Sequence, residues 1–200
     1  PQAQQIDVAL ATVAEIEALL DAATVRLPRL LHGIDRTAWP LISVVVCSYN
    51  GARTIRDCCE GLTRLDYPNI EVIVVNDGST DATPDIVSAY SFRLISTENR
   101  GLSNARNTGW QEAHGEIIAY IDDDAYPDQH WLTYLATAFM RTEHVGIGGP
   151  NLPPPDDGPI ADCVANAPGG PIHVLLSDTE AAPIPSCHMA FRRTALPAIG

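Results

Sequence analysis

Three consecutive aspartates stand where an apolar stretch of the sequence ends. Asp122, Asp123 and Asp124 directly follow the run Ile117–Ile121. Adjacent carboxylates repel one another, so they cost stability unless a cation or a helix N-terminus compensates. Carboxylate oxygens are ligands that Mg²⁺ or Mn²⁺ takes, usually together with phosphate oxygens. The triplet therefore predicts a divalent metal site, because capping of a following helix accounts for one or two carboxylates but hardly for three ahead of Pro127.

Two earlier apolar runs also end in polar residues. Ser48, Tyr49 and Asn50 follow the run that ends at Cys47, and the sequence Asn-Asp-Gly-Ser-Thr-Asp begins at Asn76. Ligands of open α/β sheets bind beyond the carboxyl ends of the parallel strands, which makes these residues candidates for a binding site. Taken alone, the second stretch is equally typical of a tight turn with a helix cap, since all its residue types favour turns.

The elements that must position these residues alternate between strands and helices. The β-branched runs are continuous rather than alternating, which is typical of strands buried on both faces. We expect four such strands, at Ile42–Cys47, Ile70–Val75, Phe92–Thr97 and Glu116–Ile121. We expect helices at Ala52–Leu65, from about Thr83, at Leu102–Ala113 and at Asp128–Arg141. This order predicts βαβ units and a mostly parallel, Rossmann-like sheet flanked by helices.

The two ends of the chain differ from the central part in the pattern of their residues. Apolar residues recur at helical spacing from Ile6 to about Leu31, so residues 1–40 are expected to form a helical extension or linker with a structural role. Residues 41–200 are expected to form the binding domain. After Val145, glycine and proline become frequent and predict a loop, with short strands at Val174–Leu176 and Met189–Phe191.

Composition and missing motifs exclude several classes of protein. The formal net charge is −13 and the pI about 4.6, which argues against a nucleic-acid or anionic-membrane surface. The sequence has no GxxxxGK[ST] loop and no GxGxxG after the first strand, which excludes P-loop and dinucleotide-binding sites. It also lacks GxSxG and HExxH, and its six histidines show no ligand spacing.

The cysteines and the lengths of the apolar runs indicate the compartment in which we expect the protein. The five cysteines form no CxxC pair, so we expect reduced thiols and a cytoplasmic protein. No apolar run reaches the length of a bilayer span, so we expect neither a membrane-spanning segment nor a signal peptide in these residues. We expect the chain to be a piece of a longer protein, whose association with the cytoplasmic face of a membrane stays open.

Four segments together resemble the family 2 glycosyltransferases, which have the GT-A fold. The resemblance rests on the order and spacing of Val44–Asn50, Val74–Asp81, Asn99–Gly109 and Ile118–Asp124, and it covers roughly Leu41 to Gly200. It implies an inverting enzyme that transfers a sugar from a nucleoside-diphosphate sugar, with a UDP-sugar expected, to a glycan, lipid or protein acceptor. The resemblance also implies dependence on Mn²⁺ or Mg²⁺.

The resemblance implies a role for each matching residue. Tyr49, flanked by Ser48 and Asn50, should stack on the nucleotide base, and Asp77 should hydrogen-bond the edge of that base. Arg106 should help to hold the pocket. The triplet corresponds to the family's DXD element. Asp123 should therefore contact the ribose and Asp124 the metal under the diphosphate, with Asp122 as a further ligand of donor or metal.

Two features depart from the family pattern. The segment Pro185–Arg193 resembles the one that closes over the donor sugar, but Ser186 and His188 stand where the family usually has Gly and Asn. The acidic general base that takes the proton of the acceptor hydroxyl is expected beyond Gly200.

Two other functions stay open at this point. A sugar nucleotidyltransferase also has a Rossmann-like sheet and a metal-binding Asp, but it carries a Gly-rich, basic loop after the first strand, which Ser48–Arg53 is not. A non-catalytic nucleotide-sugar-binding module is the second alternative.

Overall fold

The computed structural model describes residues 38–149, 158, 163 and 188–198. Their strands are β1 (Ile42–Ser48), β2 (Ile70–Asp77), β3 (Arg93–Thr97), β4 (Ile117–Asp122), β5 (Gly146–Gly148) and β6 (Met189–Arg192). Their helices are α2 (Ile55–Thr63), α3 (Thr83–Val87), α4 (Leu102–Gln111), α5 (Trp131–Arg141) and the 3-10 helix η2 (Arg193–Ala198). All belong to one compact unit, Trp39–Gly200. The expected N-terminal helix and the expected strand Val174–Leu176 lie outside the described residues.

The strands form one mixed sheet in the order β3-β2-β1-β4-β6-β5. β1 pairs in parallel with β2 and with β4, and β2 pairs in parallel with β3. β6 runs antiparallel to both β4 and β5. The prediction of a mostly parallel α/β sheet is confirmed, and the continuous apolar runs form its central strands.

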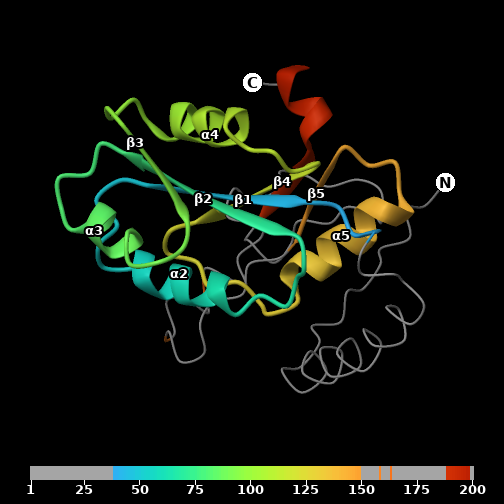
Figure 1. Cartoon of the computed structure of the whole chain (residues 1–200), viewed down its shortest axis with the longest axis horizontal. Helices are drawn as coiled ribbons and strands as arrows, with labels where there is room; N and C mark the ends of the chain where they lie inside the picture. Colours follow the sequence, from blue (N-terminus) through green and yellow to red (C-terminus); the bar gives the residue numbers. More distant parts are fainter. Residues whose placement is uncertain (1–37, 150–157, 159–162, 164–187, 199–200) are drawn as a thin grey trace. The chain divides into compact units, whose positions relative to one another are not determined.

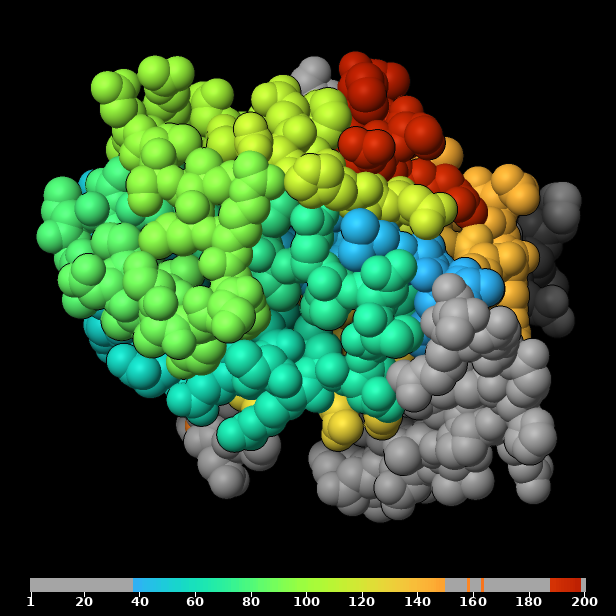
Figure 2. All heavy atoms as spheres, in the orientation of Figure 1, coloured from blue at the N-terminus to red at the C-terminus, as the bar shows by residue number. Residues whose placement is uncertain are grey.

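Helices cover both faces of this sheet (Figure 1). α4 and η2 lie over one face, and α2, α3 and α5 lie over the other. Alternate side chains of β1, β2 and β4 pack under α4 and η2 in a cluster of buried residues: Val45, Ile73, Val75, Ala105, Ala113, Ile118, Tyr120 and Leu196. Figure 2 shows α4 in light green and η2 in red along this side of the molecule. Each central strand is thus buried on both faces, as its composition predicts.

Some element boundaries differ from the sequence-based expectation. β1, β2 and β4 continue into the polar residues Ser48, Asp77 and Asp122, because the ladder is made by the main chain and tolerates polar side chains. β5 has the sequence Gly-Ile-Gly and was expected to be loop. Its two glycines give no strand signal, and it forms by pairing with β6.

Arg192 of β6 fixes the end of α5. Its guanidinium donates to the carbonyl oxygens of His144 at 3.0 Å, Phe139 at 2.7 Å and Thr142 at 2.7 Å. The same group lies 5.2 Å from the centre of the Phe139 ring. A positive charge at the C-terminus of a helix is favoured by the helix dipole. Arg192, which the sequence placed in a sugar-covering segment, therefore has a clear structural role.

Two further features of the described residues concern the cysteines and the length of the helices. Cys47, Cys58, Cys59 and Cys163 are free, whereas Cys187 lies outside the described residues. Burial raises the pKa of the Cys47 thiol to about 12 and that of Cys59 to about 11, so both are neutral at physiological pH. Among the described residues, no helix is long and apolar enough to cross a membrane.

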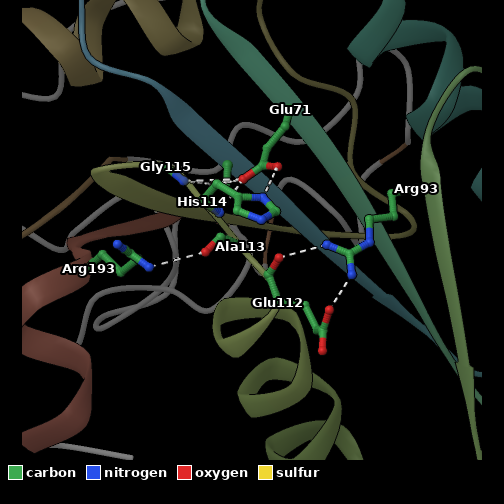
Figure 3. Close-up of polar contacts among 8 residues, drawn as sticks. Glu71, Arg93, Glu112, Ala113, His114, Gly115 and Arg193 are labelled. Carbon is green, nitrogen blue, oxygen red and sulfur yellow. Dashed lines mark hydrogen bonds and ion pairs between the residues drawn. The ribbon is translucent and has the colours of Figure 1, made fainter.

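The connection between α4 and β4 is held by polar contacts where the parallel strands begin (Figure 3). The Glu71 carboxylate accepts hydrogen bonds from the backbone N–H of His114 and of Gly115, at 2.5 and 3.2 Å, and contacts His114 Nδ1 at 3.1 Å. The buried Ser43 hydroxyl also donates to Glu71. Arg93 pairs with Glu112 at the same connection. These contacts join the starts of β1, β2 and β4.

Replacement of Glu71 tests how much these polar contacts, the junction between α4 and β4, contribute to stability. Glu71→Gln is expected to lower the free energy of unfolding at pH 7 by about 1–3 kcal/mol, because an amide replaces a carboxylate that accepts several hydrogen bonds. Burial raises the pKa of Glu71, but the hydrogen bonds from Ser43, His114 and Gly115 outweigh it and leave the pKa below its ordinary value of 4.5. A lowered carboxyl pKa contributes stability above the unfolded-state value, and that contribution is lost as the pH falls through the folded-state value.

Denaturant unfolding at several pH values checks this prediction. The difference between wild type and Glu71→Gln should be constant above pH 4.5 and shrink below it. The control is Glu112→Gln, which removes the exposed pair with Arg93 and should cost about 0–1 kcal/mol. Equal losses in the two variants would contradict the role given to Glu71.

Candidate functional site

The polar ends of three strands meet at one edge of the sheet. Ser48 at the end of β1 pairs with Asn76 of β2, and Cys47 pairs with Asp122 of β4. Asp77, the last residue of β2, pairs with Thr97 at the end of β3. The structure therefore brings these residues together at the carboxyl ends of the parallel strands.

The loops after β1 and β2 are tied together. The Asn50 side chain accepts a hydrogen bond from the Thr80 N–H at 2.9 Å, and the Asn50 N–H donates to the Ser79 hydroxyl at 2.9 Å. Asn50 has a φ of 54°, a left-handed conformation that asparagine tolerates better than most residues. These contacts engage Asn50 in holding the loop, while Tyr49 beside it remains 54% exposed.

Asp77 anchors the start of α4. It is buried, and its two carboxylate oxygens accept from the backbone N–H of Arg100 at 2.9 Å and of Gly101 at 2.8 Å. Gly78 follows with a φ of 75°, and a Cβ there would meet the backbone nitrogen of Asn99. A carboxylate has about four lone-pair sites, so Asp77 retains acceptor capacity beyond these two bonds. The anchoring contacts were not expected from the sequence.

A hollow of about 290 Å³ lies beside this contact, between the end of β3 and α4. It is lined by Thr97, Glu98, Arg100, Asn104 and Thr108. Its lining side chains carry hydroxyl, amide and charged groups, so the hollow suits a polar ligand rather than an apolar one.

The aspartates of the triplet have three different environments. Asp122 lies 3.5 Å from the Arg106 guanidinium of α4. Asp123 accepts a hydrogen bond from the Ser48 hydroxyl instead. Asp124 is exposed. Because side chains alternate between the faces of a strand, Asp122 points to the α4 side, and Asp123 comes next in the turn that follows β4.

Burial and like charges act on Asp123. Burial raises the pKa of its carboxyl, and the neighbouring carboxylates of Asp124 and Asp122 raise it further. The hydrogen bond from Ser48 partly offsets these effects. The negative charge at this strand end is thus only partly compensated by protein groups.

The triplet does not form a complete metal site by itself. In the ranges that the structure describes, no three His, Cys, Asp or Glu side chains converge on one point. Mg²⁺ is commonly bound by one or two carboxylates, with substrate phosphates and water supplying the other oxygens. The exposed Asp124 carboxylate fits that kind of site, in which the ligand completes the coordination shell.

Gly51 is a site residue that the sequence did not single out. A Cβ on Gly51 would overlap the Asp123 carboxylate and the Ser48 hydroxyl. In the sequence, a glycine after Ser-Tyr-Asn is indistinguishable from an ordinary loop glycine. Only the tertiary structure shows which side chains occupy the space.

His188 lies beside the end of β4, whereas Ser186 is outside the described residues. Since Met189 pairs with Tyr120, the register puts His188 one step closer to the triplet. Its ring packs edge-on against Trp131, with the ring centres 5.7 Å apart. A Cβ on Gly149 would meet the imidazole, so this glycine leaves room for it.

The family model and the relatives that match this chain are all glycosyltransferases. The family model described as glycosyl transferase family 2 matches residues 43–199. The putative glycosyltransferase EpsH of Bacillus subtilis (strain 168) is 47% identical over 112 residues, which are 53% of this chain and 33% of that protein. Glycosyltransferase AglE of Haloferax volcanii is 39% identical over 118 residues, 55% of this chain and 39% of that protein. The matched part of the chain thus spans 33% and 39% of the length of these two relatives.

Solved structures agree on the fold. The mannosyltransferase PcManGT from Pyrobaculum calidifontis, in complex with GDP-Man and Mn²⁺, matches with a TM-score of 0.65 and 28% identity, over 94% of this chain and 57% of that chain. S. aureus TarS 1–349 in complex with UDP-GlcNAc matches with a TM-score of 0.58 and 23% identity, over 79% of this chain and 47% of that chain. The GT-A type of sheet is confirmed, and the chain belongs to glycosyl transferase family 2.

Proposed function

We propose that this chain is the nucleotide-sugar-binding domain of an inverting, divalent-metal-dependent glycosyltransferase with a UDP-sugar donor. The observation that carries the proposal is the convergence of Tyr49, Asp77 and the aspartate triplet at one edge of the sheet. PcManGT, with 28% identity to this chain, is in complex with GDP-Man and Mn²⁺, which supports a nucleotide sugar and a metal here. The acceptor is a glycan, lipid or protein.

The order of the strands suggests how the donor lies. β2, β1 and β4 are neighbours, so Asp77, Ser48 and Asp122 follow one another along the edge. We assign the base to Tyr49 and Asp77, the ribose to Asp123, and the diphosphate to the neighbourhood of Asp124. In this arrangement the exposed Tyr49 ring stacks on the base, and the sugar lies toward β6.

The chemistry of transfer requires charge compensation at the diphosphate. A divalent cation, when bound, would offset the negative charge that develops on the leaving nucleoside diphosphate. Asp124 would hold it, with Asp122 as the second candidate, although Asp122 is already paired with Arg106. Arg106 would then act by keeping Asp122 in place. The general base is expected beyond Gly200, as the resemblance implies.

The metal assignment predicts coupling between metal and nucleotide. Wild-type chain should bind UDP more tightly with Mn²⁺ than without it, and Asp124→Asn should lose this gain, because the variant keeps the shape of the side chain but not its charge. Isothermal titration with and without Mn²⁺ measures both affinities. The matched control is Asp128→Asn, an exposed aspartate whose side chain accepts from the His130 N–H. Asn can keep that bond, so the control should retain the gain. Equal UDP affinities of the wild type in the two conditions would refute the metal assignment.

The assignment of Asp77 predicts selection among bases. Its carboxylate accepts hydrogen bonds, so it suits the ring N–H of uracil and leaves cytosine, which lacks that donor, poorly paired. A missing partner of this kind costs about 1–3 kcal/mol, so UDP should bind about 5- to 150-fold more tightly than CDP. Competition titrations with UDP, GDP and CDP in Mn²⁺ provide the measurement. If CDP competes as well as UDP, Asp77 serves only to anchor α4. If GDP binds best, the choice of UDP is wrong.

A further inference from the structure

The space next to Gly51 is occupied by a hydrogen-bonded pair. A Cβ at this position would overlap both the Asp123 Oδ2 atom and the Ser48 Oγ atom. These are the two atoms that join Ser48 to Asp123. A side chain at position 51 and the Ser48–Asp123 pair therefore exclude each other.

The backbone of Gly51 is held from both sides. Its carbonyl oxygen accepts from the N–H of Thr54 and of Ile55 at the start of α2, both at 3.0 Å. On either side of it, the Asn50 N–H donates to the Ser79 hydroxyl and the Ala52 N–H donates to Asp81 at 3.0 Å. The main chain here cannot move aside cheaply, because each of these hydrogen bonds would have to break.

The steric overlap that a side chain at position 51 would cause is thus relieved by movement of the Ser48 or Asp123 side chain. Gly51 is not among the residues with positive φ, so its backbone accepts alanine without strain. Ser48 belongs to β1, whose ladder to β2 fixes its main chain. Asp123 lies in the turn after β4, outside the strand ladder, so we expect its side chain to be the one that moves. The first consequence of a methyl group at position 51 is the loss of the Ser48–Asp123 hydrogen bond.

We propose that Gly51 is a specificity-determining position: the room it leaves lets Ser48 hold Asp123 in the orientation that recognises the ribose hydroxyls of the donor nucleotide. This inference rests on the proposed function, in which Asp123 contacts the ribose. With Oδ2 engaged by Ser48, the Oδ1 atom of Asp123 is the acceptor left for a ribose hydroxyl. Gly51 acts through Asp123 and is a positioning residue.

Deoxy nucleotides provide the test. Affinities of UDP, 2′-deoxy-UDP and 3′-deoxy-UDP in Mn²⁺ are measured by isothermal titration for the wild type and for Gly51→Ala. The wild type should prefer UDP over at least one deoxy form by about tenfold or more, the usual effect of a hydrogen bond to a charged group. In Gly51→Ala this preference should fall to about twofold or less, while the deoxy form binds as it does to the wild type.

Two further variants distinguish positioning from general damage. Asp123→Ala should also lose the preference, and adding Gly51→Ala to it should not change the ratio of UDP to deoxy-UDP affinity further, because the methyl group then displaces only a Ser48 hydroxyl that no longer holds a carboxylate. Gly146→Ala is the matched control, since it puts the same methyl against Phe191 of β6, away from Asp123. It should keep the full preference for UDP.

The outcomes separate this inference from the function on which it rests. Retention of the wild-type ribose preference by Gly51→Ala overturns the inference, and so does an equal loss of affinity for UDP and its deoxy forms. A wild-type chain that binds UDP but does not distinguish the deoxy forms overturns it too. A wild-type chain that binds neither UDP nor GDP overturns the proposed function, and this inference falls with it.

Discussion

The parallel register between β1 and β4 determines which way each aspartate of the triplet faces. Cys47 pairs with Asp122, so Asp122 reaches Arg106 on the α4 side and Asp123 reaches Ser48. The side-chain period of a strand is two, so a slip of one residue would exchange the two directions. Arg106 and Ser48 would then each lose their partner, and Asp123 would no longer lie next to Gly51. The geometry of the whole site therefore depends on the main-chain ladder between β1 and β4.

That register is held by features far from the carboxyl edge. Buried apolar side chains lie on both faces of β1 and β4, so a slip of one residue would exchange the side chains that pack under α4 with those that pack on the opposite face. At the opposite edge, Ser43 and Glu71 bind the Gly115 N–H just before β4 begins. A polar junction among buried strands is stable only when its hydrogen bonds are made, so it is sensitive to small shifts. The amino ends of the strands therefore contribute to the geometry of residues at their carboxyl ends.

The sequence predicted what depends on composition and missed what depends on contacts. The continuous runs around Val45, Ile73 and Ile118 predicted the buried strands, and the polar residues after them predicted the edge at which the site lies. The opposite surroundings of Asp122 and Asp123, however, follow from pairing partners that a single sequence does not show. Asp77 was expected to face a base, but its oxygens also anchor α4, because the N-terminal N–H groups of that helix lie within reach. β5 was missed, since Gly-Ile-Gly forms a strand only beside β6.

Three adjacent residues of one type thus differ through their surroundings alone. Arg106 compensates the charge of Asp122, whereas Asp123 is half-buried and held by a neutral hydroxyl. Asp124 is exposed to solvent, where a carboxylate is well hydrated and free to exchange water for another partner. A chain with a net charge of −13 repels a diphosphate at long range, so attraction has to arise locally. Within the described part of the chain, the exposed Asp124 carboxylate makes no hydrogen bond or ion pair. A cation that bridges to phosphate would therefore break the fewest contacts by binding there. The different roles proposed for the three aspartates follow from these differences in their burial and in their partners.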